Sequence, residues 1–392
     1  MMRRAKNILK NSKYFKYMQT IRFFASSSLN KIDGSRKKYP KVIQLPLTYA
    51  CNAKCVMCNI WKMDHSNEMS LDEFSQYLKD PIFKEVQAVG INGGEPSLIK
   101  NLPDYAEEIC KLPSLTSLNI ISHGFNDRKL KTALKEIYQV CKKYNKNFHI
   151  SISLDGVEEI HNTVRGKDVF RKTFPTILEI TQNQSEYCDS FDMGCTIIKQ
   201  NVDYLVELDT FLKLNNLQDK IKYRLGIDNK RIESDQIKDQ YSVIFDKLDS
   251  GYSSVRQSAK EFLLGRVGIA KTINDKFKYF ALFYWLNAPK PKRLLGCLWQ
   301  EEGITMDARG KLFYCAVASD EIGGLRSGRS GEEIFFDQNN INHRKDILKN
   351  KCDDCIHDYA GKTHISNIWI FIKYAFHRRL AMRIYKFKGL FL

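Results

Sequence analysis

The sequence predicts an α/β protein built on a partial (β/α)6 barrel of the TIM type, followed by a small cysteine-rich module. Between residues 42 and 226, β-rich apolar runs alternate with longer helical stretches, a pattern typical of parallel sheets with right-handed crossovers. Four of these runs are followed at once by residues of types that commonly bind ligands. In parallel sheets, ligands gather at the carboxyl ends of the strands. A chain of 392 residues, 43% of them hydrophobic, can bury a core of this size.

The predicted strands cover residues 42–48, 86–91, 117–121, 148–154, 190–197 and 220–226. Two of the helices between them have clear signals. Ser70 and Glu73 are spaced as a capping box that opens a helix over 70–78. Apolar residues recur at helical spacing over 129–144, which predicts a second helix. A polar turn ending in Gly310 predicts a β-hairpin at 307–310.

The domain plan predicted from these elements has five parts. They are a basic N-terminal arm (1–41), the barrel core (42–231), a helical insertion (232–290), an auxiliary module (291–361) and a basic amphipathic tail (362–392). The net charge of +17 belongs to the two ends, because the arm carries +11 and the tail +7, which leaves −1 for the body. A nearly neutral body argues against a dedicated nucleic-acid surface.

Composition also indicates the compartment. No apolar stretch approaches the ~20 residues that a membrane-spanning helix needs, and the first residues lack the apolar segment of a secretory signal. The cysteines occur in metal-type groups, which favours a reducing, cytoplasmic setting. Aromatic residues alternate with basic ones in both ends, so either peripheral association with the inner membrane face or solvated docking helices would explain them.

Three cysteines in the order Cys51-x3-Cys55-x2-Cys58 follow the first predicted strand. A [4Fe-4S] cluster normally takes four thiolates, so three on one loop would leave one iron open to another ligand. A zinc site is the alternative, since cysteine-rich loops with two-residue gaps are common there.

The segment ACNAKCVMCNIW around these cysteines resembles the signature of radical S-adenosylmethionine (radical SAM) enzymes, with Met57 where that family often has an aromatic residue. The resemblance implies a [4Fe-4S] cluster held by Cys51, Cys55 and Cys58, with S-adenosylmethionine chelating the open iron. It also implies reductive cleavage of S-adenosylmethionine to a 5′-deoxyadenosyl radical that abstracts hydrogen from a substrate.

Further motifs extend the resemblance to the SPASM and twitch branch of that family, which carries auxiliary clusters. Gly93-Gly94-Glu95-Pro96 follows the second strand and resembles the GGEP motif, whose carbonyls and Glu95 are implied acceptors for the amino group of the cofactor. Ser153 and Arg165 are implied ligands of its carboxylate. Ser122 and Asp155 complete the implied cofactor-binding set. His123, where relatives often have Asn, is left unassigned.

The second cysteine group is Cys297-x12-Gly310-x4-Cys315 followed by Cys352-x2-Cys355. It resembles a twitch module, which implies one auxiliary [4Fe-4S] cluster with no open iron. Zinc is again the alternative.

The function expected from this resemblance is a radical SAM oxidoreductase acting on a small metabolite such as a sugar or cyclitol, with an external flavodoxin- or ferredoxin-type electron donor. A peptide-modifying maturase is the alternative; the 41 residues before the first strand are few for the peptide-recognition domain such enzymes often carry. An electron carrier or metal-stabilised binding protein is the non-enzymatic alternative. The sequence assigns no catalytic base.

Overall fold

The computed structural model describes residues 37–125, 127–227, 254–357 and 361–388, together with residues 21, 23, 32 and 359. Its contacts divide the chain into two compact units. The larger unit takes its described residues from Asp33–Ala259 and Trp299–Cys352, and the smaller one from Met1–Ile32, Lys260–Leu298 and Asp353–Leu392. Because each unit combines separate segments, the boundaries between the five predicted parts stay predictions.

The larger unit is built on a sheet of nine strands among the described residues, in the order β6-β5-β4-β3-β2-β1-β7-β8-β9. The barrel strands are β1 (Val42–Thr48), β2 (Ala88–Gly93), β3 (Ser117–Ser122), β4 (Asn147–Ser153), β5 (Ser190–Ile197) and β6 (Ile221–Leu225). Each pairs in parallel with the next. This sequential parallel order confirms the predicted partial (β/α)6 barrel.

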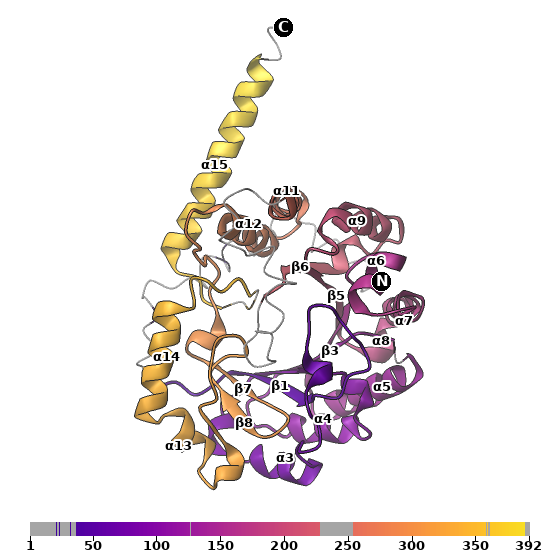
Figure 1. Ribbon diagram of the computed structural model, residues 1–392, viewed down its shortest axis with the longest axis vertical. Coiled ribbons are helices and arrows are strands. Elements are labelled where there is room, and N and C mark those ends of the chain that lie inside the picture. Colours follow the sequence, from indigo (N-terminus) through magenta and orange to yellow (C-terminus); the bar gives the residue numbers. More distant parts are fainter. Residues whose placement is uncertain are drawn as a thin grey trace. The chain divides into compact units, whose positions relative to one another are not determined.

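The helices that connect these strands are typical βαβ crossovers. In chain order they are α3 (Leu71–Tyr77), α4 (Leu102–Cys110), α5 (Asp127–Lys143), α6 (Glu158–Arg165), α7 (Phe170–Gln182), α8 (Gln184–Tyr187) and α9 (Leu205–Leu214). In Figure 1 helices α4, α5, α7 and α9 lie along the outer side of the strands. Short 3-10 turns at Ile60–Lys62, Pro81–Phe83 and Pro96–Leu98 complete the connections near the site.

Strand β3 illustrates how the sequence produces this arrangement. Leu118 and Ile120 are fully buried, whereas Asn119 between them is only partly so. Burying each such aliphatic side chain contributes about 1.5–3 kcal/mol to folding. The period of two therefore directs the apolar face of the strand into the core.

The predicted elements agree closely with the observed ones. Strands 42–48 and 190–197 have the predicted ends, and the other four differ by one or two residues at one or both ends. The capping box is confirmed, because Ser70 accepts from the Glu73 amide (3.2 Å) while the Glu73 carboxylate accepts from the Ser70 amide (3.0 Å).

The predicted hairpin is also present. Strand β7 (Gly303–Met306) extends the sheet in parallel with β1, and β8 (Lys311–Phe313) and β9 (Gly323–Gly324) follow antiparallel. Gly310 has φ +77°, a conformation that glycine adopts without strain. Helices α13 (Gly331–Phe335) and α14 (Gln338–Asn350) complete the larger unit.

The smaller unit contains α12 (Ile273–Asn287) and α15 (Ile365–Lys388), and α11 (Ser254–Ile269) spans its boundary. Aromatic contacts join α12 to α15: Phe280 lies 5.2 Å from Phe371 and 4.6 Å from Tyr374 between ring centroids. Among the helices described, none has the length and apolar character needed to cross a membrane.

Candidate active site

The cysteine loop starts from a fixed point at the end of β1. Glu68 accepts hydrogen bonds from the Thr48 hydroxyl (2.9 Å) and the Tyr49 amide (2.5 Å). The Tyr49 hydroxyl donates to Asp307 in the β7–β8 turn at 2.6 Å, and this bond is buried. These contacts attach the base of the loop to both its own downstream segment and the hairpin.

The three predicted cluster cysteines share one environment. Cys55 is buried with Phe125 and Val169, and Cys51 and Cys58 pack against the same apolar cluster. Burial is the main cause that raises the pKa of Cys51 to about 12, and the nearby Cys55 and Cys58 thiols add to it. Thiolates in such surroundings need a positive partner. Three neighbouring thiols in an apolar wall fit the donor set of an iron-sulfur cluster.

The two glycines of the GGEP motif are needed where the second strand passes the cysteine loop. A Cβ on Gly94 would lie 2.0 Å from the Ala50 carbonyl oxygen, and one on Gly93 would lie 2.5 Å from that of Thr48. Gly93 also has φ +118°. The close backbone approach expected at this turn is thus made by the residues just before Cys51.

Glu95 is buried, with both carboxylate oxygens occupied. One oxygen accepts from the Ser122 hydroxyl (2.7 Å) and the Ser97 amide (3.1 Å). The other accepts from the His123 amide at 3.1 Å and lies 3.2 Å from His123 Nε2. Burial raises the pKa of Glu95, and these hydrogen bonds oppose the rise. The carboxylate therefore organises the turn that follows β3.

The buried Asp155 and the partly buried Arg165 form the second polar group of the site. Arg165 Nε donates to Asp155 at 2.5 Å, and its Nη1 lies 3.6 Å from the Cys55 sulfur. Burial alone would lower the pKa of Arg165, but the adjacent Asp155 carboxylate and Cys55 outweigh it and raise that pKa. The Thr196 amide donates to the other Asp155 oxygen at 2.7 Å. The guanidinium is thus fixed beside the cysteine loop.

The predicted site residues form two connected sets. Cys55, Arg165 and Asp155 are linked directly, and Ser122 is linked to Glu95. Ser153 is the last residue of β4 and lies two positions before Asp155. It pairs in register with Gly194 of β5. Ser122 and Ser153 end barrel strands, Glu95 and Asp155 lie two residues beyond strand ends, and Arg165 is the last residue of α6.

Two asparagines of the site were not predicted. Asn52 Oδ1 lies 2.9 Å from His123 Nε2. Asn201 is buried and donates from Nδ2 to the backbone carbonyls of Asp155 and Thr196, both at 2.9 Å. The only sequence signal for Asn52 is its place between Cys51 and Ala53, and Asn201 carries none.

The second cysteine group is distributed over both units. Cys315 and Cys352 belong to the larger unit, and Cys297 and Cys355 to the smaller one. In the smaller unit, Arg293 donates to the Cys355 carbonyl (3.1 Å) and lies 3.6 Å from its sulfur. Over the described residues, no three His, Cys, Asp or Glu side chains converge as ligands of a single metal ion.

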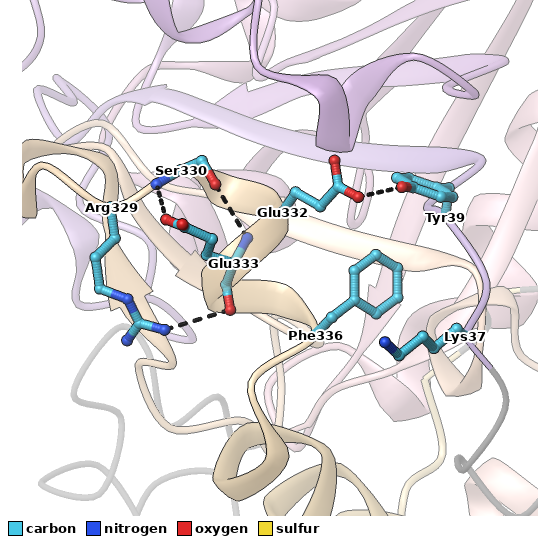
Figure 2. A pocket seen from close by; sticks show the side chains of 7 residues that line it. All are labelled: Lys37, Tyr39, Arg329, Ser330, Glu332, Glu333 and Phe336. Carbon is cyan, nitrogen blue, oxygen red and sulfur yellow. Dashed lines mark hydrogen bonds between the residues drawn. The ribbon is translucent and has the colours of Figure 1, made fainter.

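A hollow of about 690 Å³ lies elsewhere on the larger unit (Figure 2). Tyr39 donates to Glu332 across it, and Phe336 and Lys37 also line it. It contains none of the predicted site residues.

Fold and site together define the class: an α/β barrel protein with an iron-sulfur type cysteine loop at the carboxyl edge of its parallel strands. Residues 45–212 match the model of the radical SAM superfamily. The chain therefore contains a radical SAM domain and is a radical SAM enzyme, whose cofactors are [4Fe-4S] clusters and S-adenosylmethionine. The resemblance to the SPASM and twitch branch is confirmed by its relatives.

Among curated proteins, a PqqA peptide cyclase of Bradyrhizobium diazoefficiens is 24% identical over 81% of this chain and 78% of its own length. The sporulation killing factor maturation protein SkfB of Bacillus subtilis is 27% identical, over 38% of this chain and 35% of its own. A GTP 3′,8-cyclase of Alkaliphilus metalliredigens is 22% identical over 74% and 85%.

Solved structures share the fold. Native anSMEcpe with bound AdoMet and the Cp18Cys peptide has a TM-score of 0.57 at 17% identity, covering 88% of this chain and 99% of that one. Streptococcus suis SuiB bound to S-adenosylmethionine has a TM-score of 0.52 at 12% identity, covering 83% and 76%. At these identities the likeness concerns the fold alone.

Proposed function

We propose that this radical SAM enzyme modifies a peptide, so that its product is a matured peptide or protein. The similarity to PqqA peptide cyclase carries the proposal, because it spans most of both chains and not only the radical SAM domain. The name of SkfB also points to maturation. Peptide modification is therefore preferred to the sugar or cyclitol oxidation expected from the sequence.

The cofactor roles follow from the chemistry of the site. Cys51, Cys55 and Cys58 hold the cluster, which, when S-adenosylmethionine is bound, supplies its reductive cleavage and hydrogen abstraction from the substrate. Arg165, fixed by Asp155, presents its guanidinium to the cofactor carboxylate. Ser153 adds a hydroxyl to the same group, and Ser122 borders the ribose.

The amino group of the cofactor needs acceptors. A carboxylate offers about four lone-pair sites, and those of Glu95 face four donors in this structure. The carbonyls of Gly93 and Gly94 are therefore the main acceptors in our proposal, while Glu95 holds the turn beside them.

We propose that the four later cysteines hold one auxiliary [4Fe-4S] cluster. These are Cys297, Cys315, Cys352 and Cys355. Zinc is the competing occupant. Iron, sulfide and zinc measured per chain after anaerobic reconstitution distinguish them. A content of about eight irons per chain would support two clusters. A content of about four irons and one zinc would show that the auxiliary site holds zinc and not a cluster.

The experiment that tests the function uses the reconstituted full chain, dithionite, S-adenosylmethionine and peptides encoded beside its gene. We expect 5′-deoxyadenosine together with a peptide whose mass has changed, for example by the loss of two hydrogens. Formation of 5′-deoxyadenosine with no peptide change, but with turnover of a sugar, cyclitol or nucleotide, would overturn the peptide proposal and keep the class.

A small-molecule substrate is the second candidate, favoured by the similarity to GTP 3′,8-cyclase over 74% of this chain. The external electron donor is proposed to be a flavodoxin or ferredoxin in either case. Turnover supported by such a protein in place of dithionite tests this point.

We also propose peripheral association with an anionic membrane through the basic tail. Trp369 and Phe376 are exposed on α15, and residues 362–392 carry seven basic side chains and no acidic one. Salt-sensitive co-sedimentation of the full chain with phosphatidylglycerol vesicles is the expected result. No binding to these vesicles at low salt would end this part of the proposal.

A further inference from the structure

His123 occupies a place in the site that the cofactor roles do not explain. Its side chain is almost fully buried, at 4% exposed. It belongs to the turn after β3 and contacts Asn52 of the cysteine loop, a segment far from it in the sequence. The Thr173 hydroxyl donates to its carbonyl at 3.0 Å, which fixes the backbone there.

The hydrogen bonds of the ring determine its protonation. The Phe125 amide donates to Nδ1 at 3.2 Å, so Nδ1 acts as an acceptor. Burial lowers the pKa of His123 to about 2, and the neighbouring Arg165 adds to this, so the ring is neutral. A neutral ring with an accepting Nδ1 carries its proton on Nε2.

The proton on Nε2 faces two oxygens. Asn52 Oδ1 is 2.9 Å away and Glu95 Oε2 is 3.2 Å away. Asn52 belongs to the cysteine loop, and Glu95 ends the Gly93-Gly94 turn. One N–H therefore connects the metal-ligand segment with the segment proposed to bind the cofactor amine.

The face of the ring is linked to the same loop through Phe125. It stacks on Phe125 with centroids 3.3 Å apart and planes 12° apart. Phe125 in turn belongs to the apolar cluster of Ala53 and Cys55. Both the edge and the face of His123 thus support residues between Cys51 and Cys55.

We propose that His123 is a positioning residue that sets the cysteine loop against the Glu95 turn through Asn52, and so aligns the open iron with the amine acceptors. The proposal rests on the proposed cofactor roles of Cys51–Cys58 and Gly93–Glu95. Residues that orient metal ligands in this way typically contribute 10–100-fold to affinity or activity.

The test compares His123→Phe, which keeps a ring to stack on Phe125 but removes both nitrogens, with Asn52→Ala and the double variant. In the reconstituted full chain, we expect His123→Phe to weaken S-adenosylmethionine binding about tenfold. We also expect it to alter the change that the cofactor causes in the EPR spectrum of the reduced cluster. The double variant should bind no more weakly than His123→Phe, because both changes break the same contact.

Two further variants complete the design. His123→Gln places an N–H near the position of Nε2 and should restore binding, and iron content if His123→Phe loses iron. His149→Phe is the matched control, because that ring contacts Ser190 (2.8 Å) and Asp192 in the same sheet, so binding should stay at the wild-type value.

Several outcomes would overturn the proposal: unchanged binding and spectrum in His123→Phe, additive losses in the double variant, or no rescue by His123→Gln. Failure of the wild-type chain itself to bind S-adenosylmethionine would instead reject the proposed function.

Discussion

The two cysteine groups each place an arginine at one sulfur, and both arginines have little exposed surface. Arg165 Nη1 lies 3.6 Å from Cys55, and Arg293 Nη1 lies 3.6 Å from Cys355. Their other partners differ. Arg165 is paired with the fully buried Asp155 carboxylate, whereas Arg293 donates to the carbonyls of Leu295, Cys355 and Tyr359.

This difference concerns charge. At Cys55 the carboxylate balances the guanidinium, so the arginine is held firmly but adds little net positive charge. Around Arg293, the hydrogen-bond partners seen in the described residues carry no charge, so its positive charge remains for the sulfur. A cluster with four thiolates carries one more negative charge than a cluster with three. The Arg293 arrangement therefore suits the proposed four-thiolate site.

Removal of one cysteine from each group should give the largest contrast. Cys55→Ala takes away one of three ligands of the cluster that cleaves the cofactor, so we expect no detectable 5′-deoxyadenosine. Cys355→Ala leaves that cluster intact, so cleavage should persist while substrate turnover falls. Chromatographic assay of 5′-deoxyadenosine and product in parallel measures both.

The control for this contrast is Cys188→Ala, at a buried cysteine outside both groups. It should keep both activities and the wild-type iron content. Equal loss of cofactor cleavage in Cys55→Ala and Cys355→Ala would contradict separate roles for the two groups.

Removal of each arginine should have the next largest effect. Arg165→Met leaves Asp155 buried without its cationic partner, which typically costs about 3–5 kcal/mol of stability. Arg293→Met leaves carbonyls without a donor, for which we expect about 1–3 kcal/mol. Urea unfolding of the two variants without clusters, followed by circular dichroism, gives the comparison.

Arg309→Met serves as a control, because Arg309 is also hydrogen-bonded, but to the exposed Asp64. Its effect should stay within about 1 kcal/mol, as for other surface pairs. A smaller loss for Arg165→Met than for Arg293→Met would show that the buried carboxylate does not determine how these arginines are held.

Most of the barrel could be predicted because its information is local. Strand periodicity and the Ser70 capping box depend on neighbouring residues, and the first cysteines lie within one loop. The His123–Asn52 contact joins residues 71 positions apart, which no local pattern specifies. The distribution of the later cysteines over two units is likewise a property of chain assembly and not of spacing.

The glycines beside the two cysteine groups provide the smallest expected effect and the sharpest comparison. A Cβ on Gly94 would lie 2.0 Å from Ala50 O, and one on Gly361 would lie 2.6 Å from the Cys297 carbonyl carbon. Neither glycine has a positive φ, so crowding against backbone is the cause in both cases. We expect Gly94→Ala and Gly361→Ala each to cost about 1–3 kcal/mol, with Gly94→Ala the larger.

Gly90→Ala is the matched control, since it lies on the same strand as Gly93 and a Cβ there meets nothing within 4 Å. Its stability should equal or slightly exceed that of the wild type, because alanine restricts the unfolded chain. Urea unfolding measures all three variants. Unfolding of Gly94→Ala at the same urea concentration as Gly90→Ala would mean that the cysteine loop can shift at Ala50 without cost. The inference that close backbone contact holds the first cysteine group in place would then be wrong.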